Sequence, residues 1–224
     1  MNEDAKIALS EKELELVCNT DWILTKHSVI EKVYRLFGSI ALSMQGFVEE
    51  NKTILPAIVL ASNPKISKGE NYLKLPYVML DYPRHFTKED SLAIRTLFWW
   101  GNFFSINLHL SGISKRRAIP ALLQRFSTLQ TGNYFICVSE DPWQHHFNED
   151  NYLPLRQCTA EDFATILFSK DFVKIAKKIH LSHWDSATSF INYTFGEMLM
   201  MVEISSRGDE KDPSPGIPIT DFDP

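Results

Sequence analysis

The chain has 224 residues, of which 44% are hydrophobic and 23% charged, and its formal net charge is −5. This length and composition predict one domain with a core of its own, and they exclude a collagen-like or wholly disordered chain. The longest uninterrupted apolar stretch, residues 54–61, is far shorter than the roughly 20 residues that cross a bilayer, so we expect no membrane partner.

Helical patterns fill the first third of the chain. Two capping-box sequences, Ser10 with Glu13 and Ser28 with Glu31, predict a short helix that ends near residue 18 and a long one that begins at Ser28. Apolar side chains recur at helical spacing through the second segment as far as Val48. Prolines and a lysine–glycine pair after this helix predict a connecting region.

The middle third has the composition of a sheet. Aromatic and β-branched residues, and in one segment a strict alternation of apolar and polar positions, predict strands. Three strands and a candidate fourth are expected over Tyr72–Tyr82, Asn102–Leu110, Asn133–Ser139 and Tyr152–Arg156. Two helices are expected between these strands, from Thr87 to about Phe98 and from Ser114 to Leu129.

Helical patterns return in the last third. Three helices are expected there, a short one that starts at Thr159, a second from Ser169 to about His180, and a long one that starts at Ser182. The whole order predicts an α+β domain, in which a small, largely antiparallel sheet of three to four strands is covered by helices from both chain termini. We assign this single domain to residues 1–206 and an acidic, proline-rich C-terminal tail to residues 207–224.

The cysteines and the first ten residues indicate where in the cell the protein is located. Cys18, Cys137 and Cys158 have no short spacing, which is typical of small buried residues in a reducing environment. The first ten residues are acidic and polar, unlike a secretory leader. We therefore expect a cytoplasmic protein.

Residue spacing excludes several classes of site. No two glycines lie closer than eight positions, whereas a dinucleotide fingerprint or a P-loop needs glycines about two to five positions apart. The chain also has no zinc-binding cysteine pair, so we expect no cofactor and no metal. Its basic segments are short, at residues 115–117 and as a lysine stripe over 170–178 on a predicted helix. We interpret them as solvated faces and expect no nucleic-acid partner.

The densest chemistry lies between residues 65 and 109. Polar side chains of the alternating strand follow tryptophans and charged groups, a combination that could bind a small polar ligand. The candidate ligand-binding residues are Arg84, Trp99, Trp100, Asn107 and His109. The candidate catalytic residues are His109, as a general acid or base, and Asp81, which would orient it. A simpler interpretation pairs Asp81 with Arg84 or Arg95, places the tryptophans in the core and leaves the polar face in water.

Three functions are open on the sequence alone. The first is a domain that binds a small polar ligand or a protein partner at residues 65–109, without chemistry of its own. The second is a metal-independent acid–base or hydrolytic enzyme that uses His109, for which we expect this histidine about 3 Å from a carboxylate and with a shifted pKa. The third is a structural subunit of a homo-oligomer, with the terminal helices as its interface.

Overall fold

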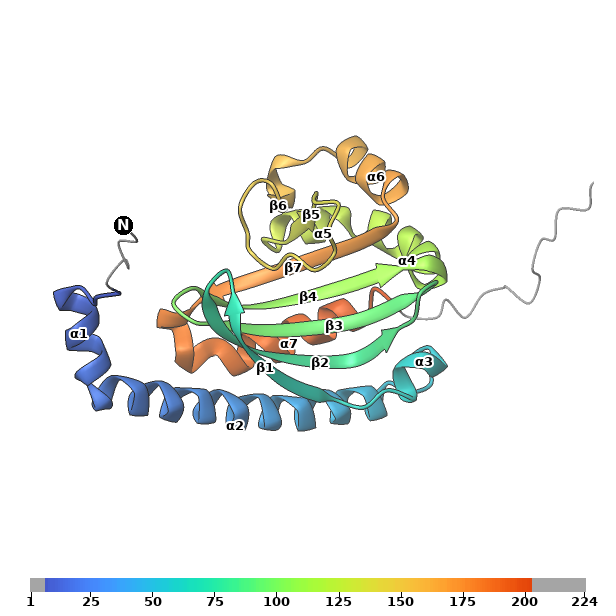
Figure 1. The fold of residues 1–224 in the computed structure, drawn as a ribbon. Helices are drawn as coiled ribbons and strands as arrows, with labels where there is room; N and C mark the ends of the chain where they lie inside the picture. Colours follow the sequence, from blue (N-terminus) through green and yellow to red (C-terminus); the bar gives the residue numbers. More distant parts are fainter. Residues whose placement is uncertain (1–6, 203–224) are drawn as a thin grey trace, which may run out of the picture.

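A computed structural model describes residues 7–202, and an antiparallel sheet of seven strands lies at its centre (Figure 1). The strand order is β1-β2-β3-β4-β7-β5-β6, so a four-stranded meander is extended by β7, which arrives from late in the chain. The strands are β1 Lys65–Tyr72, β2 Leu75–Phe86, β3 Ser91–Trp99, β4 Phe103–Ser111, β5 Phe135–Cys137, β6 Tyr152–Pro154 and β7 Phe172–His180.

The helices come mostly from the two ends of the described segment. The α-helices are α1 Glu11–Cys18, α2 Thr20–Glu50, α3 Ala57–Leu60, α4 Gly112–Gln124, α5 Phe126–Thr131, α6 Ala160–Ser169 and α7 Ala187–Leu199. Two 3-10 helices are η1 Leu155–Gln157 and η2 Leu181–Ser186. Within residues 7–202, none of the helices combines the length and the apolar character that crossing a membrane requires.

The main core lies between one face of the sheet and the helices α2 and α7 (Figure 1). The side chain of Asn19 accepts a hydrogen bond from the Trp22 N–H and caps the start of α2. Phe37 of α2, Phe104 of β4 and Phe195 of α7 are fully buried in this core. Each such side chain contributes about 1.5–3 kcal/mol through its removal from water. The apolar positions of β4 therefore face the helices, and its polar positions face the other way.

The opposite face of the sheet is covered by a loop. Residues 138–151 connect β5 to β6 and fold back over β7 and β4; we call them the covering loop (Figure 1). Beneath it lie the polar positions Asn107 and His109 of β4 and Lys174 of β7, all of which are buried. Polar groups buried in this way have to be paired or they cost stability, so this face is where the chemistry of the domain concentrates.

The predicted sheet of three to four strands is wrong in size, because the structure has seven strands. Part of the difference is β1, which occupies residues expected to connect the long helix that begins at Ser28 to the sheet. The other part comes from two segments expected to be helices. The segment expected to be helical over 87–98 contains most of β3, and the one over 169–180 contains β7.

Both segments that were expected to be helices have sequence patterns that do not show the alternation typical of a strand. In β3, eight of the nine residues are buried, so the strand is apolar on both faces and shows little alternation. In β7, lysines four positions apart imitate the stripe of an amphipathic helix. In the structure Lys174 lies on the face beneath the covering loop, and Lys177 lies on the helix side. The predicted tail, 207–224, lies outside the described residues.

Candidate functional site

A row of polar side chains crosses the middle of the sheet beneath the covering loop. Asp81 of β2 lies opposite Arg95 of β3, and Arg95 lies opposite Asn107 of β4. Two residues further along β4, His109 lies opposite Lys174 of β7. We call these five residues the polar cluster. Four of them are buried and the fifth, Arg95, keeps only 14% of its side chain exposed.

Asp81 and Arg95 form a two-point ion pair. The Arg95 Nε lies 2.7 Å from Asp81 Oδ1, and its Nη2 lies 3.3 Å from Oδ2. The guanidinium also lies 5.5 Å from the ring centre of Phe86 and 5.3 Å from that of Trp143. The ion pair with Asp81 and the two aromatic rings beside the planar guanidinium hold Arg95 in one position. The Asp81 carboxylate is thereby bound to the arginine.

Two buried polar atoms of the cluster, one an amide oxygen that accepts and one a ring nitrogen that accepts or donates according to its tautomer, have no hydrogen-bond partner among residues 7–202. They are Asn107 Oδ1 and His109 Nδ1. The Asn107 amide nitrogen donates to the backbone oxygen of Arg95 at 3.2 Å, which sets the orientation of the side chain. A buried polar atom without a partner costs about 1–3 kcal/mol and is uncommon in folded proteins. Six such atoms occur among the described residues, and two of them lie in this cluster.

His109 is neutral in this environment. Burial lowers its pKa to about 3, and the positive charges of Lys174 and Arg95 act in the same direction. Three aromatic rings lie 5.6–5.9 Å from the imidazole centre, those of Phe86, Trp143 and Phe172. A base with so low a pKa accepts a proton poorly at neutral pH, so this histidine is better suited to hydrogen bonding than to proton transfer.

Lys174 connects the sheet to the covering loop. Its Nζ donates to the carbonyl oxygens of Pro142 at 2.8 Å and Gln144 at 2.6 Å. Burial lowers the pKa of this lysine to about 8. The cation therefore loses its proton within reach of physiological pH, and the loop carbonyls are what hold it.

A second contact fastens the covering loop at its other side. The hydroxyl of Tyr72 accepts hydrogen bonds from the backbone N–H groups of His145 at 2.6 Å and His146 at 3.0 Å. The side chain of Trp143, in the same loop, lies against the cluster. Its ring centre lies 5.6 Å from that of His109, and 52% of the residue is exposed. Trp143 therefore contacts the polar cluster on one side and solvent on the other.

The structure brings three of the sequence-predicted site residues together: Asp81, Asn107 and His109. Trp99 faces the same side of the sheet but lies further along β3, where its indole N–H donates to the Tyr72 carbonyl at 3.3 Å. These residues share one face because β2, β3 and β4 are paired in register with a side-chain period of two.

The other two predicted ligand-binding residues lie elsewhere. Trp100 is on the helix side, where its ring centre lies 6.3 Å from that of Trp22. Arg84 is exposed, and its backbone N–H donates to the Ser62 hydroxyl at 2.6 Å. Neither residue contributes to the polar cluster as the structure stands.

Sequence reasoning missed Lys174 and the covering loop. The spacing of Lys170, Lys174 and Lys178 predicts a helix face, and Phe172 and Ala176 on the same side of the strand hide its polar character. Arg95 was considered only as a partner for Asp81. The loop residue Trp143 carries no local pattern that marks its position over the sheet.

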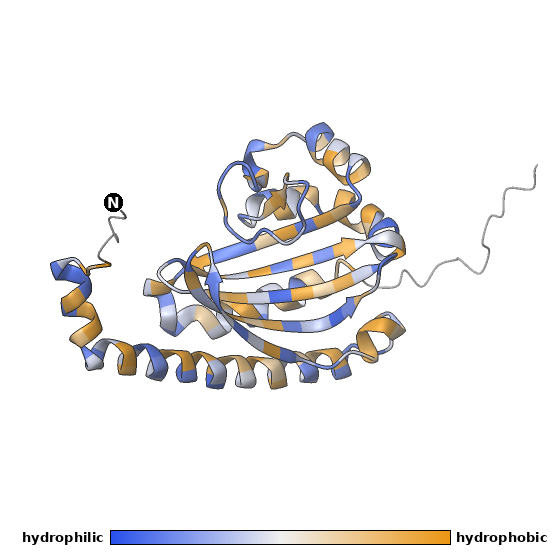
Figure 2. Ribbon diagram, in the orientation of Figure 1, coloured by the Kyte–Doolittle hydropathy of each residue, from blue (hydrophilic) through white to orange (hydrophobic). Residues whose placement is uncertain are grey.

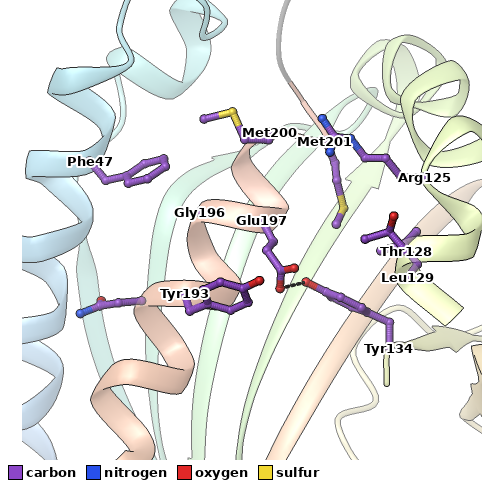
Figure 3. Close-up of a pocket in the computed structure, with 11 residues that line it drawn as sticks. Phe47, Arg125, Thr128, Leu129, Tyr134, Tyr193, Gly196, Glu197, Met200 and Met201 are labelled. Atoms are coloured by element: carbon purple, nitrogen blue, oxygen red, sulfur yellow. Dashed lines mark hydrogen bonds between the residues drawn. The ribbon is translucent and has the colours of Figure 1, made fainter. Parts of the chain in front are cut away.

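A cavity of about 380 Å³ lies on the helix side, between α2, α5 and α7 (Figure 3). There the Tyr134 hydroxyl donates to the Glu197 carboxylate at 2.8 Å, and Lys177 Nζ lies 3.6 Å from the same carboxylate. Burial raises the pKa of Tyr134, which keeps it a donor. One buried oxygen of this cavity, Asn192 Oδ1, has no partner among the described residues, whereas the polar cluster has two such atoms beside a buried cation. We therefore take the polar cluster as the stronger candidate site.

The geometry expected of an acid–base enzyme is present only in part. The pKa of His109 is shifted, but the cluster's carboxylate is bound to Arg95 and His109 Nδ1 has no partner among the described residues. Within residues 7–202, no three histidine, cysteine or carboxylate side chains gather as a metal ion would require. Comparisons with protein-family models, with curated proteins and with solved structures find no match for this chain.

Proposed function

We propose that this protein is a ligand-binding module whose polar cluster takes a small hydroxylated anion, with the covering loop as its lid. The single observation that carries this proposal is the pair of unpartnered buried polar atoms, Asn107 Oδ1 and His109 Nδ1, beside the buried cation of Lys174. A cytoplasmic location belongs to the same proposal. The three unpaired cysteines support it, because thiols persist in reducing compartments.

The charges of the cluster favour an anion. Two cations, Arg95 and Lys174, face one carboxylate, Asp81, and His109 is neutral. The Lys174 Nζ donates to two backbone carbonyl oxygens and lies 5.3 Å from the ring centre of Tyr152, and the charge of Asp141 also favours the cation. A carboxylate or phosphate of the ligand would replace the two carbonyl oxygens as its hydrogen-bond partner. Asn107 Oδ1 needs a donor, and a hydroxyl group next to the anionic group would supply one; because a hydroxyl both donates and accepts, it also suits His109 Nδ1 in either tautomer.

Binding requires the covering loop to lift. Its carbonyl oxygens at Pro142 and Gln144 hold Lys174, and the ring of Trp143 lies over His109 and Arg95. Short loops that bind through a few hydrogen bonds open more readily than the elements of a core. We infer that the ligand takes the place of the Trp143 ring and of the two carbonyl contacts.

Thermal unfolding in the presence of simple anions tests this proposal. We choose malate as the hydroxylated probe, succinate as its counterpart without the hydroxyl, and inorganic phosphate. A site-bound anion at ten times its dissociation constant stabilises the fold by about 1.4 kcal/mol, or roughly 3–6 °C for a chain of this length. We expect malate to shift the melting temperature more than succinate does.

Matched variants locate the effect. Lys174→Met removes the cation beneath the loop and is expected to abolish the malate shift. Lys177→Met removes a cation of the same strand that lies beside Glu197 on the other face, and it is expected to retain the shift. Trp143→Ala uncovers the cluster and is expected to tighten binding. Equal loss in Lys174→Met and Lys177→Met, or no shift with any of the three anions, would contradict the proposal.

A further inference from the structure

The N-terminal part of the described chain projects away from the body. The helix α1 has no buried residue, and in Figure 1 it lies beyond the end of the sheet. We call residues 9–24, which comprise α1 and the first turns of α2, the arm. Seven of its large apolar residues are exposed, Leu9, Leu14, Leu16, Val17, Trp22, Ile23 and Leu24. Figure 2 shows apolar segments along the helix that extends beyond the sheet. An apolar surface of this kind usually marks a binding site.

The arm is both apolar and acidic. Leu14, Val17 and Cys18 lie three and four positions apart and therefore share one face of α1. Glu11 and Glu13 flank that face. Counting four acidic residues and one lysine, residues 9–24 carry a charge of −3. A partner for this arm should offer an apolar floor with basic edges.

The chain has a groove of that chemistry at its other end. It has a volume of about 1000 Å³ and lies between α4, the end of α6 and the turn from β2 to β3. Leu123 and Phe168 line it and are 36% and 65% exposed. Its lining includes four basic and two acidic residues, a charge of +2. Among the described residues, no carboxylate pairs with Lys88 or Arg116.

The arm and the groove of one molecule lie far apart. The arm begins α2, whereas the groove lies beside α4, at the end of the molecule where α2 finishes (Figure 1). A helix of 31 residues is about 46 Å long. The arm therefore has to meet a groove on another molecule.

We propose that the arm of one molecule docks in the groove of a second copy of the same chain, with the face of Leu14 and Val17 on Leu123 and Phe168. The acidic residues Glu11 and Glu13 then lie near the basic edge of the groove. This inference is independent of the ligand site, which lies on the sheet face beneath the covering loop. Charge complementarity sets the register, and burial of the apolar side chains holds the two copies together.

Cross-linking of an exposed native cysteine tests the contact. Cys18 lies on the docking face of the arm and is exposed, whereas Cys137 and Cys158 are buried. In Leu123→Cys, oxidation or a short bis-maleimide is expected to join Cys18 of one copy to the introduced thiol of another. Tyr193→Cys places a thiol on α7 at a residue 67% exposed and is the matched control, expected to give no covalent dimer.

Charge exchange supplies an independent readout. Wild type is expected to show at least twice the chain mass of 25.8 kDa by light scattering in the micromolar range. Glu11→Lys with Glu15→Lys, which leaves the capping box of Ser10 and Glu13 intact, is expected to give monomers, and so is Lys88→Glu with Arg116→Glu. An equimolar mixture of the two variants is expected to restore a complex, because each supplies the charge that the other lost.

Three results would overturn the inference. One is a monomeric mass for the wild type up to millimolar concentration. Another is cross-linking through Tyr193→Cys as efficient as through Leu123→Cys. The third is an oligomer that both charge variants leave intact. The surface variants change exposed side chains, so circular dichroism and thermal unfolding show whether each one is folded before its mass is measured.

Discussion

The burial of His109 predicts a pH dependence of stability that can be isolated with one substitution. His109 is 3% exposed, and burial together with Lys174 and Arg95 lowers its pKa from 6.5 to about 3. Between these two pH values the His109 imidazole is protonated in the unfolded chain and neutral in the folded chain. The stability due to this group is therefore complete above pH 6.5 and is lost as the pH falls towards 3.

The expected magnitude follows from the shift. At pH 5 the imidazole is protonated in the unfolded chain and neutral in the folded chain. Because pH 5 lies about 1.5 units below 6.5 and each unit corresponds to about 1.4 kcal/mol, the free energy of unfolding falls by about 2 kcal/mol. His109→Gln keeps a polar side chain of similar size that does not titrate. Relative to this variant, the wild type should lose about 2 kcal/mol of unfolding free energy between pH 7 and pH 5, measured by urea denaturation.

A second histidine serves as the control. His27 is exposed on α2, so His27→Gln is expected to change the same pH difference by less than about 0.5 kcal/mol. If the wild type and His109→Gln lose stability in parallel over this range, His109 is accessible to protons in the folded state. The account of a covered cluster would then be wrong.

Four variants test the contacts of the cluster and its cover. Lys174→Met removes both hydrogen bonds to loop carbonyls, so amide hydrogen exchange in residues 138–151 should become about tenfold faster or more. Asp81→Asn leaves the charge of Arg95 without its partner and should cost about 3 kcal/mol in urea denaturation, whereas Asp81→Leu with Arg95→Met should cost less. Tyr72→Phe removes the acceptor of two loop N–H groups and should cost about 1–2 kcal/mol in the same assay. Unchanged exchange, an equal cost for both Asp81 variants, or a neutral Tyr72→Phe would each contradict the corresponding contact.

The sequence indicated the polar face of β4 because its alternation is complete. Asn107 and His109 fall on one side of that strand and the apolar residues on the other, and a period of two is enough to assign them. The segment that supplies Lys174 gave no such signal, since its lysines also fit a helical stripe. This segment forms a strand and not a helix because it pairs with β4, a contact between residues more than sixty positions apart.

The partner of Asp81 and the cover of the cluster depend on long-range geometry as well. Both Arg84 and Arg95 were reasonable partners from sequence, and strand register selects Arg95 by placing it directly opposite Asp81. The position of Trp143 depends on where β5 and β6 join the sheet. Local sequence contains neither fact, so the cluster could be predicted in part and its lid could not.

The protonation of Lys174 gives the most direct test of the proposed site. Its pKa is lowered to about 8 by burial, so at pH 8 about half of the molecules lack the proton. An anion beside this lysine restores it, and malate titrated calorimetrically in buffers of different ionisation enthalpy should bind with uptake of about half a proton. The uptake should be close to zero at pH 6 and absent in Lys174→Met. Malate binding without proton uptake at pH 8, or with the same uptake in Lys174→Met, would contradict an anion site beneath the covering loop.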